Sequence, residues 1–370
     1  MTPKKVLILG GRGRIGSSVA LDLLIHDRAQ VIVTGRSNSN AVSPELGQFG
    51  DRLQYLALDL ADTIRLTKAI ASVDLVVHCA GPFRQRNTSV LNACIGEGVN
   101  YIDVSDDRVF TQAALEKGAA AESAGVTAII NTGVFPGISN SMVRQGVEQL
   151  ETPEEIHIKY VVAGSGGAGI TVMRTTFLNI QHAFDAWIDG RWQKVRPYTG
   201  KETVKFPFPF GNANVYWFDM PESYTLAKTF PIKTVTTKFG TFPDFYNKLT
   251  WLTANWFPKR LMQSSTFIEA LAHVSHQMAS VTDRFSGTGV AIRVDVLGKK
   301  NGGVPAHYHS TFVHPSAAIA TGLGAGSIGQ FILAQKIQKP GVWPVEQVVT
   351  TPFFEQMLES RQLSVRQHWS

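Results

Sequence analysis

The sequence predicts an α/β fold, with an N-terminal Rossmann domain built on a doubly wound parallel sheet and a second, α+β domain whose sheet is mostly antiparallel. Two patterns support this prediction. Short apolar runs alternate with helical patterns up to about residue 135, whereas apolar and polar residues alternate singly from about Glu151. The first pattern is typical of parallel strands covered by helices on both faces, and the second of antiparallel strands with one buried face.

The chain length also suits two domains, because 370 residues exceed what one ordinary core holds. We expect the Rossmann domain over residues 1–138 and a substrate or dimerisation domain over 139–325. The remaining residues, 326–370, are expected to form helices that return to the Rossmann domain.

The composition is that of a globular protein. Hydrophobic residues make up 44% and charged residues 17% of the chain, and the net charge is +6. This mild basic excess fits an anionic cofactor or a weak preference for a membrane surface, and no nucleic-acid motif is present. The two cysteines, Cys79 and Cys94, form no C-x-x-C pair, no signal peptide is evident, and the run 317–337 is too polar for a membrane span. We therefore expect a cytoplasmic protein.

Six strand-like runs with helical patterns between them make up the first domain. The strands are expected at Val6–Leu9, Val31–Val33, Tyr55–Leu58, Leu75–Val77, Tyr101–Val104 and Thr127–Ile130. The helical patterns include Thr63–Ala71, Thr88–Ile95 and Phe110–Ser123. Ligands of such sheets bind beyond the carboxyl ends of the strands, so the residues that follow each strand are the candidate site.

A glycine-rich turn follows the first strand and leads into a helical pattern. Its glycines satisfy G-x-G-x-x-G, which permits a tight turn and brings the backbone close to a pyrophosphate at the helix N-terminus. The predicted contacts are Gly10, Gly11, Arg12, Gly13, Arg14, Ile15 and Gly16.

The same spacing recurs twice, at 164–169 and at 324–329. The copy at 164–169 lacks a βαβ unit, and we leave open whether it is a plain strand–helix turn or an anion site. The copy at 324–329 follows an alanine-rich helical pattern, and we interpret it as helix packing at small residues.

The second strand ends at the position that selects between NAD(H) and NADP(H). An NAD site usually carries an acidic residue here, about 20 residues beyond the glycines, and none is present in Thr34–Asn38. Arg36 and Ser37 suit a 2′-phosphate instead, and Arg12 could assist. The sequence therefore favours NADP(H) over NAD(H), the alternative being that both arginines are ordinary solvated side chains.

The later strand ends add further candidates, each with a structural alternative. Asp59 and Leu60 would lie near the adenine, although Asp59 could instead cap a helix. After the fourth strand, the small residues Ala80 and Gly81, followed by Pro82 and Phe83, leave room for the nicotinamide or form only a tight turn. Asp103 could orient the substrate, while Ser105 or Asp106 caps the next helix. Phe135 could pack on the nicotinamide, or its loop could be only a domain hinge.

Several stretches together resemble the saccharopine dehydrogenase-like (saccharopine reductase-like) NADP-binding oxidoreductases, in particular the cyanobacterial and plastid-type members. These stretches are VLILGGRGRIG, VDLVVHCAGPF, YIDVSDD, NTGVFPGISN, AGSGGAG and KPGVWPVEQ. The resemblance implies a Rossmann domain with an α+β domain and a pyridine-nucleotide oxidoreductase. It further implies that the glycine loop and Arg36 bind the nucleotide phosphates. No clear pair of arginines is placed to clamp the two carboxylates of saccharopine, so the resemblance does not extend to that substrate.

The second domain is expected to contain mainly antiparallel strands. These are Ile156–Val162, Asn214–Phe218, Thr234–Phe239, Ala291–Leu297 and Tyr308–Val313, with a helical run at Ile170–Trp187. A further helical run, Val345–Glu359, lies in the C-terminal part that is expected to return to the Rossmann domain. His307 and His309 share one strand face but lack a third partner with sensible spacing, so no metal site is predicted. His307 is a candidate general acid, and Tyr216 and Arg174 are weaker candidates.

The segment 239–260 is rich in aromatic residues beside basic ones. It is either a core helix with its flanks, or an apolar lid or interfacial segment that contacts a membrane surface or a lipophilic substrate.

We expect an NADP(H)-dependent oxidoreductase that transfers a hydride to or from a C=N, C=O or C=C bond of a small molecule and that forms a homodimer. The sequence leaves open whether this molecule is lipophilic. A scaffold or redox sensor that binds NADP(H) without chemistry is the alternative. An isomerase or dehydratase is disfavoured, because no Tyr-x-x-x-Lys pair follows the fourth strand.

Overall fold

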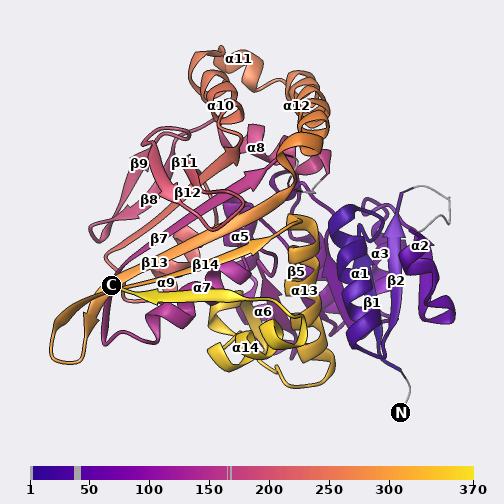
Figure 1. Ribbon diagram of the computed structural model, residues 1–370. Coiled ribbons are helices and arrows are strands. Elements are labelled where there is room, and N and C mark those ends of the chain that lie inside the picture. Colours follow the sequence, from indigo (N-terminus) through magenta and orange to yellow (C-terminus); the bar gives the residue numbers. More distant parts are fainter. Residues whose placement is uncertain (1–2, 37–42, 165, 167–168) are drawn as a thin grey trace. The chain divides into compact units, whose positions relative to one another are not determined.

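The computed structural model describes residues 3–36, 43–164, 166 and 169–370 (Figure 1). The chain divides into two compact units, Met1–Ile138 with Ala318–Val349 and Ser139–Ala317 with Thr350–Ser370. The sequence predicted a return to the Rossmann domain at residue 326 that lasts to residue 370. In the structure the return begins at 318, whereas residues 350–370 belong to the second unit.

The first unit is built on a parallel sheet of seven strands in the order β15-β6-β5-β4-β1-β2-β3. The strands are β1 (Lys5–Leu9), β2 (Gln30–Gly35), β3 (Leu53–Ala57), β4 (Leu75–His78), β5 (Asn100–Asp103), β6 (Thr127–Ile130) and β15 (Gly341–Pro344). Val6 to Leu9 are fully buried, as expected for a strand covered on both faces. The predicted doubly wound sheet is confirmed, and β15 adds an edge strand that its four residues, with Gly and Pro at the ends, did not reveal.

Helices connect these strands. They are α1 (Arg14–His26), α2 (Pro44–Gly47), α3 (Thr63–Ile70), α4 (Ser89–Gly96), α5 (Arg108–Leu115), α6 (Gly118–Ser123) and α13 (Ala317–Leu333), with short 3₁₀ turns at Gly50–Arg52, Phe83–Gln85 and Val345–Gln347. The single helix predicted over 110–123 is two helices, because the N–H of Lys117 bonds the carbonyl of Ala114, three residues back, at 3.0 Å and closes a tighter turn.

Helix α13 packs on α1 through small residues. A Cβ added to Gly322 would lie 2.5 Å from the Cβ of Ser18, and one added to Gly326 would lie 2.2 Å from a carboxylate oxygen of Asp22. The two helices therefore approach too closely for larger side chains. The glycine pattern at 324–329 is thus a helix-packing surface, as predicted.

The second unit contains a mixed sheet of nine strands, with the order β10-β11-β12-β7-β13-β14-β16 along its main path. The strands are β7 (Thr152–Ala163), β8 (Phe184–Ile188), β9 (Arg191–Val195), β10 (Glu202–Lys205), β11 (Asn212–Trp217), β12 (Thr234–Phe242), β13 (Gly289–Lys300), β14 (Val304–His314) and β16 (Val365–Trp369). Within the described residues only β12 and β7 pair in parallel, so the predicted, mostly antiparallel sheet is confirmed.

The helices of this unit are α7 (Ile138–Val147), α8 (Ile170–Asn179), α9 (Glu222–Thr229), α10 (Phe245–Trp256), α11 (Lys259–Met262), α12 (Ser265–Ser286) and α14 (Thr351–Ser360). The helix predicted over 170–187 ends at Asn179, because residues from Phe184 pair as β8 with β9 and β12. The helix predicted over 345–359 begins at Thr351, with Pro352 in its first turn.

The aromatic segment is not a core helix. Phe239 is buried in β12, but the side chains of α10 and the turn after it are open: Phe245 is 54%, Trp251 41%, Trp256 74% and Phe257 38% exposed. Helices α10, α11 and α12 lie together beyond the ends of β11 and β12 (Figure 1).

Candidate functional site

The glycine loop joins β1 to α1 and is held by its own backbone. Gly10 has φ of +74°, and its N–H donates to Oγ1 of Thr34 on β2 at 3.1 Å. The N–H of Gly13 then donates to the carbonyl of Gly10 at 2.9 Å. These bonds fix a tight turn at the carboxyl end of the sheet, in the position where Rossmann domains bind a pyrophosphate.

The loop is crowded on the inside and open on the outside. A Cβ at Gly16 would lie 2.4 Å from the carbonyl oxygen of Gly10, whereas a Cβ at Gly13 would meet only that same oxygen, at 3.2 Å. Gly13 is exposed and is the N-cap of α1. Because it has no side chain to cap the helix, the first-turn N–H groups near Arg14 and Ile15 can serve an anion.

Arg12 lies across the end of β2. Its Cδ is 2.7 Å from the position that a Cβ of Gly35 would take, and its guanidinium carbon lies 5.4 Å from the ring centre of Tyr55. The hydroxyl of Tyr55 donates to the carbonyl of Gly35 at 3.2 Å. The arginine is thus oriented by an aromatic face and stays exposed beside the strand end.

Arg86 is a second basic residue near Arg36 at the carboxyl end of the parallel sheet. The pKa of Arg86 is lowered, first by burial and then by the positive charge of Arg36, while Asp59 opposes the shift. Nε of Arg86 donates to the carbonyl of Ala80 at 2.9 Å. Among the described residues, neither arginine has a carboxylate within ion-pair distance. Arg86 was not among the residues predicted from the sequence, although a basic residue just beyond the Gly-Pro turn that follows β4 was the available signal.

Asp59 and Leu60 were predicted to lie near the adenine, and in the structure both contact other parts of the protein. Asp59 accepts from the N–H of Ala61 at 3.0 Å, and Asp62, not Asp59, caps α3 by accepting from Arg65 N–H at 3.1 Å. Leu60 packs against the hydrophobic core. Ser37 lies outside the described residues.

The turn after β4 divides into open and buried parts. Ala80, Gly81 and Pro82 form the turn, and Ala80 is half-buried. Phe83 is only 3% exposed and contacts the ring of Phe110 at 4.9 Å between ring centres, so it belongs to the core of the unit. Burial also raises the pKa of the Cys79 thiol, which disfavours the thiolate that a nucleophile needs.

Asp103, at the end of β5, is fully buried. One of its oxygens accepts from the N–H groups of Ser105 and Asn131, both at 3.0 Å, and the other from the Tyr101 hydroxyl at 3.1 Å. Burial raises its pKa to about 6 against the effect of these bonds. Its hydrogen bonds tie the end of β5 to the residue that follows β6.

Asp106 is the more open carboxyl of the same loop. The side chain of Asp107, not that of Ser105 or Asp106, caps α5 by accepting from the Phe110 N–H at 2.8 Å. This leaves Asp106 half-buried, with its pKa raised to about 7 by burial and by the negative charge of Asp107. The sequence analysis assigned Asp106 only to capping and so missed it as a titrating group.

The other predicted residues have these surroundings. Phe135 is half-buried in the loop after β6. Tyr216 on β11 is 7% exposed and stacks on Tyr198 with 5.2 Å between ring centres, and burial raises its pKa. Arg174 donates to both carboxylate oxygens of Glu269, at 2.7 and 2.6 Å, which occupies its guanidinium.

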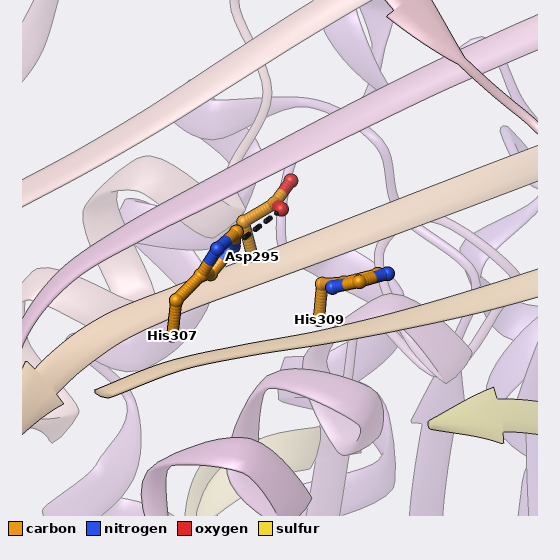
Figure 2. A group of neighbouring side chains, drawn as sticks. All are labelled: Asp295, His307 and His309. Carbon is orange, nitrogen blue, oxygen red and sulfur yellow. Dashed lines mark hydrogen bonds and ion pairs between the residues drawn. The ribbon is translucent and has the colours of Figure 1, made fainter. Parts of the chain in front are cut away.

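His307 and His309 have a third neighbour that spacing along one strand could not reveal. It is Asp295 of β13, whose Oδ1 lies 2.8 Å from Nε2 of His307 (Figure 2). The two imidazole centres are 5.5 Å apart. Spacing along the sequence did not reveal this third side chain, because it comes from the adjacent strand.

Comparison with known proteins bears on the first unit most directly. Residues 6–129 match the model of the saccharopine dehydrogenase NADP binding domain. This part of the chain is therefore similar to a saccharopine dehydrogenase NADP-binding domain, which indicates a nicotinamide cofactor. The match agrees with the predicted resemblance, whereas the finer likeness to cyanobacterial and plastid members stays a prediction.

Two curated relatives span most of the chain. The carboxynorspermidine synthase of Vibrio cholerae is 23% identical over 88% of this chain and 84% of its own length, and that of Vibrio alginolyticus is 24% identical over 83% and 81%. Among solved structures, apo saccharopine dehydrogenase (L-Glu forming) from Saccharomyces cerevisiae matches with a TM-score of 0.71, at 14% identity, over 99% of this chain and 100% of its own. The overall fold thus matches that of the yeast saccharopine dehydrogenase structure. No helix in the described part of the chain has the length and hydropathy to cross a membrane.

Proposed function

We propose that the protein is an NADP(H)-dependent oxidoreductase acting on a small molecule. The observation that carries this proposal is made at the carboxyl end of the parallel sheet. There the glycine loop, the N-terminus of α1 and two arginines close to each other follow the neighbouring strands β1, β2 and β4. The family of the NADP-binding domain and the dehydrogenase and synthase names of the relatives support an enzyme over a scaffold.

The residues present fit the dinucleotide. The N–H groups of Gly10 to Gly13 already have hydrogen-bond partners within the protein, so the first turn of α1 is the part that offers backbone N–H groups to the pyrophosphate. Arg36 and Arg86, together with Arg12 at the end of β2, supply positive charge for a 2′-phosphate. Two guanidiniums that repel each other, with no carboxylate of the described residues at ion-pair distance, gain most from a dianion between them. This supports a preference for NADP(H) over NAD(H).

When bound, the nicotinamide supplies or accepts a hydride, here for a C=N, C=O or C=C bond of the substrate. The chain contributes binding and orientation, which alone can account for a large part of a rate enhancement. For proton transfer in the loop after β5 we propose Asp106, since its pKa of about 7 suits an acid or base at neutral pH. We assign Asp103 to holding the strand ends. Of the candidates in the second unit, His307, whose side chain is 32% exposed, is better suited to proton transfer than the buried Tyr216.

A titration of the protein with NADPH and NADH, followed by nucleotide fluorescence, tests the cofactor. Saturable binding with NADPH tighter than NADH is expected, and no saturable change with either nucleotide would contradict the proposal. Oxidation of bound NADPH in a screen of imines, ketones and enones then separates the enzyme from the alternative, a non-catalytic NADP(H) scaffold or redox sensor.

We also propose that α10–α12 contact an anionic membrane surface peripherally. Leu252 and Leu261 are 40% and 43% exposed beside the open Trp251 and Trp256, and Lys248 and Arg260 add positive charge. Aromatic rings beside basic side chains are typical of interfacial helices. The predicted homodimer and the cytoplasmic location stay predictions, the first of which sedimentation equilibrium would test.

A further inference from the structure

One face of the second sheet gathers imidazoles around a carboxylate. Asp295 on β13 lies directly opposite His309 on β14, and His307 lies two residues along β14 on the same face. One potential ligand atom from each of the three side chains lies within 4.8 Å of the other two. Figure 2 shows His307 directed at Asp295 and His309 beside them.

Imidazole nitrogens and a carboxylate oxygen are ligands that zinc and similar divalent transition metals prefer. Two imidazole nitrogens with one carboxylate oxygen form a common ligand set for Zn²⁺, Co²⁺ and Ni²⁺, whereas Mg²⁺ and Ca²⁺ prefer oxygen alone. The three side chains come from paired strands, so the sheet ladder fixes their spacing without a flexible loop.

His309 has an unexplained polar atom. Its Nδ1 is buried and has no hydrogen-bond partner among the residues that the structure describes. The ring itself is held by stacking on His368 of β16, with 4.9 Å between centres and 21° between planes. Because a buried imidazole nitrogen without a partner is costly, this atom points to a ligand that completes it.

We propose that Asp295, His307 and His309 bind one divalent transition-metal ion of the zinc class. Three protein ligands leave a coordination position for water or another ligand, as in open zinc sites. The proposal is independent of nucleotide binding, since all three residues belong to the second sheet.

The charges around the site permit a dication, although Asp295 has competing partners. Arg293 donates to both of its oxygens, with the closest contact at 2.8 Å, and Nζ of Lys159 lies 3.0 Å away. Lys159 also pairs with Glu202, which in turn pairs with Lys238. Glu202 thus offsets part of the positive charge of Lys159 and Lys238, and the metal has to displace Arg293 in part from Asp295.

The test is a calorimetric titration of the untagged, chelator-treated full chain with Zn²⁺, together with the visible spectrum of the Co²⁺-loaded protein. We expect saturation at one ion per chain. His307→Ala and His309→Ala should each weaken Zn²⁺ binding at least about tenfold. His273→Ala, at an exposed position on α12 outside the cluster, is the matched control and should bind as the wild type does.

Absence of saturable binding to the wild-type chain would overturn the proposal, and so would equal affinities of the wild type and both histidine variants. An equal loss in His273→Ala would also overturn it, since binding would then not be specific to the cluster. If the alanine variants do not fold, Arg293→Met provides a gain-of-binding test, because it frees Asp295 and should raise the affinity. The Co²⁺ spectrum of the wild type must also change from that of the aqueous ion.

Discussion

Arg36 and Arg86 lie close together at the carboxyl end of the parallel sheet, and the positive charge of Arg36 lowers the pKa of Arg86. Such a pair of like charges destabilises the empty domain and is relieved by an anion. The two residues follow β2 and β4, strands that lie on either side of β1 and its glycine loop. The arrangement therefore places positive charge beside the pyrophosphate position.

Replacement of either arginine should show that this pair of charges determines the preference for NADP(H) over NAD(H). Arg36→Ala and Arg86→Ala should each weaken NADPH binding by about 10- to 100-fold, the loss of a charge-assisted hydrogen bond, and weaken NADH binding much less. Fluorescence titration with both nucleotides measures the two affinities.

Arg28→Ala is the matched control for these variants. Arg28 is exposed just before β2, at the opposite end of the strand from Arg36, so the variant removes the same charge away from the site. Its NADPH affinity should equal that of the wild type. Equal losses of NADPH and NADH in Arg36→Ala would contradict the 2′-phosphate assignment.

The glycine loop makes a second prediction, in which two similar substitutions have different effects. Gly16→Ala places a Cβ against the backbone of Gly10 and should destabilise the fold by about 1–3 kcal/mol as well as abolish nucleotide binding. Gly13→Ala meets little within the protein, so it should fold normally and lose affinity only. Thermal denaturation and NADPH titration of both variants separate these effects, and normal binding by Gly13→Ala would place the pyrophosphate elsewhere.

Asp103 should make the first unit less stable as pH rises. Its pKa is 3.8 as a free side chain and about 6 in the fold. Between pH 3.8 and about 6 the carboxyl group is therefore protonated in the folded state but ionised in the unfolded state. Stability from this group is complete below about pH 4 and is lost as pH rises to about 6, by about 3 kcal/mol. In Asp103→Asn the amide oxygen can still accept from Ser105 and Asn131, and the NH₂ can donate to Tyr101. Denaturant unfolding from pH 4 to 7 should therefore show a smaller decline in this variant than in the wild type, and equal slopes would refute the assignment.

Asp106 should affect turnover rather than stability. With a pKa raised to about 7, it changes its charge near neutral pH, and kcat should change with pH around that value. Asp106→Asn should remove this dependence and lower kcat by about 10²- to 10⁴-fold, with little change in NADPH affinity. Asp103→Asn is the control, expected to retain most of the activity, and a full pH profile in Asp106→Asn would exclude the proton-transfer role. Steady-state kinetics require the substrate that the NADPH oxidation screen identifies.

The Rossmann sheet could be predicted because its information is local. Each strand is a short run of apolar residues buried on both faces, and the glycine loop directly follows Leu9, so neither required knowledge of distant contacts. In contrast, β15 and β16 are short strands, and β16 is mostly exposed; they form only because β6 and β14 offer free edges. No local pattern in the sequence marks such edges.

The candidate site divides in the same way. Arg36 was found because it stands at a fixed distance from the glycines, whereas Arg86 reaches the same edge through a turn whose direction the sequence does not specify. Asp295 and His309 are separated by the hairpin that joins β13 and β14, so their pairing depends on strand register. Asp103 could be predicted as a candidate because it ends a strand, whereas its three hydrogen-bond donors depend on contacts that the sequence does not reveal.

The exposed aromatic side chains of α10 lead to the last prediction. Trp256 is 74% exposed, and transfer of an indole ring from water to a lipid interface is favourable, with Lys248 and Arg260 attracted to anionic headgroups. The wild type should therefore sediment with anionic phospholipid vesicles at low salt and less with neutral ones. Trp256→Glu should reduce this binding severalfold. Ile64→Glu, on α3 at a position that is 81% exposed, introduces the same charge outside the segment and should leave binding unchanged. Equal sedimentation of both variants with the wild type would show that α10 is not a membrane contact.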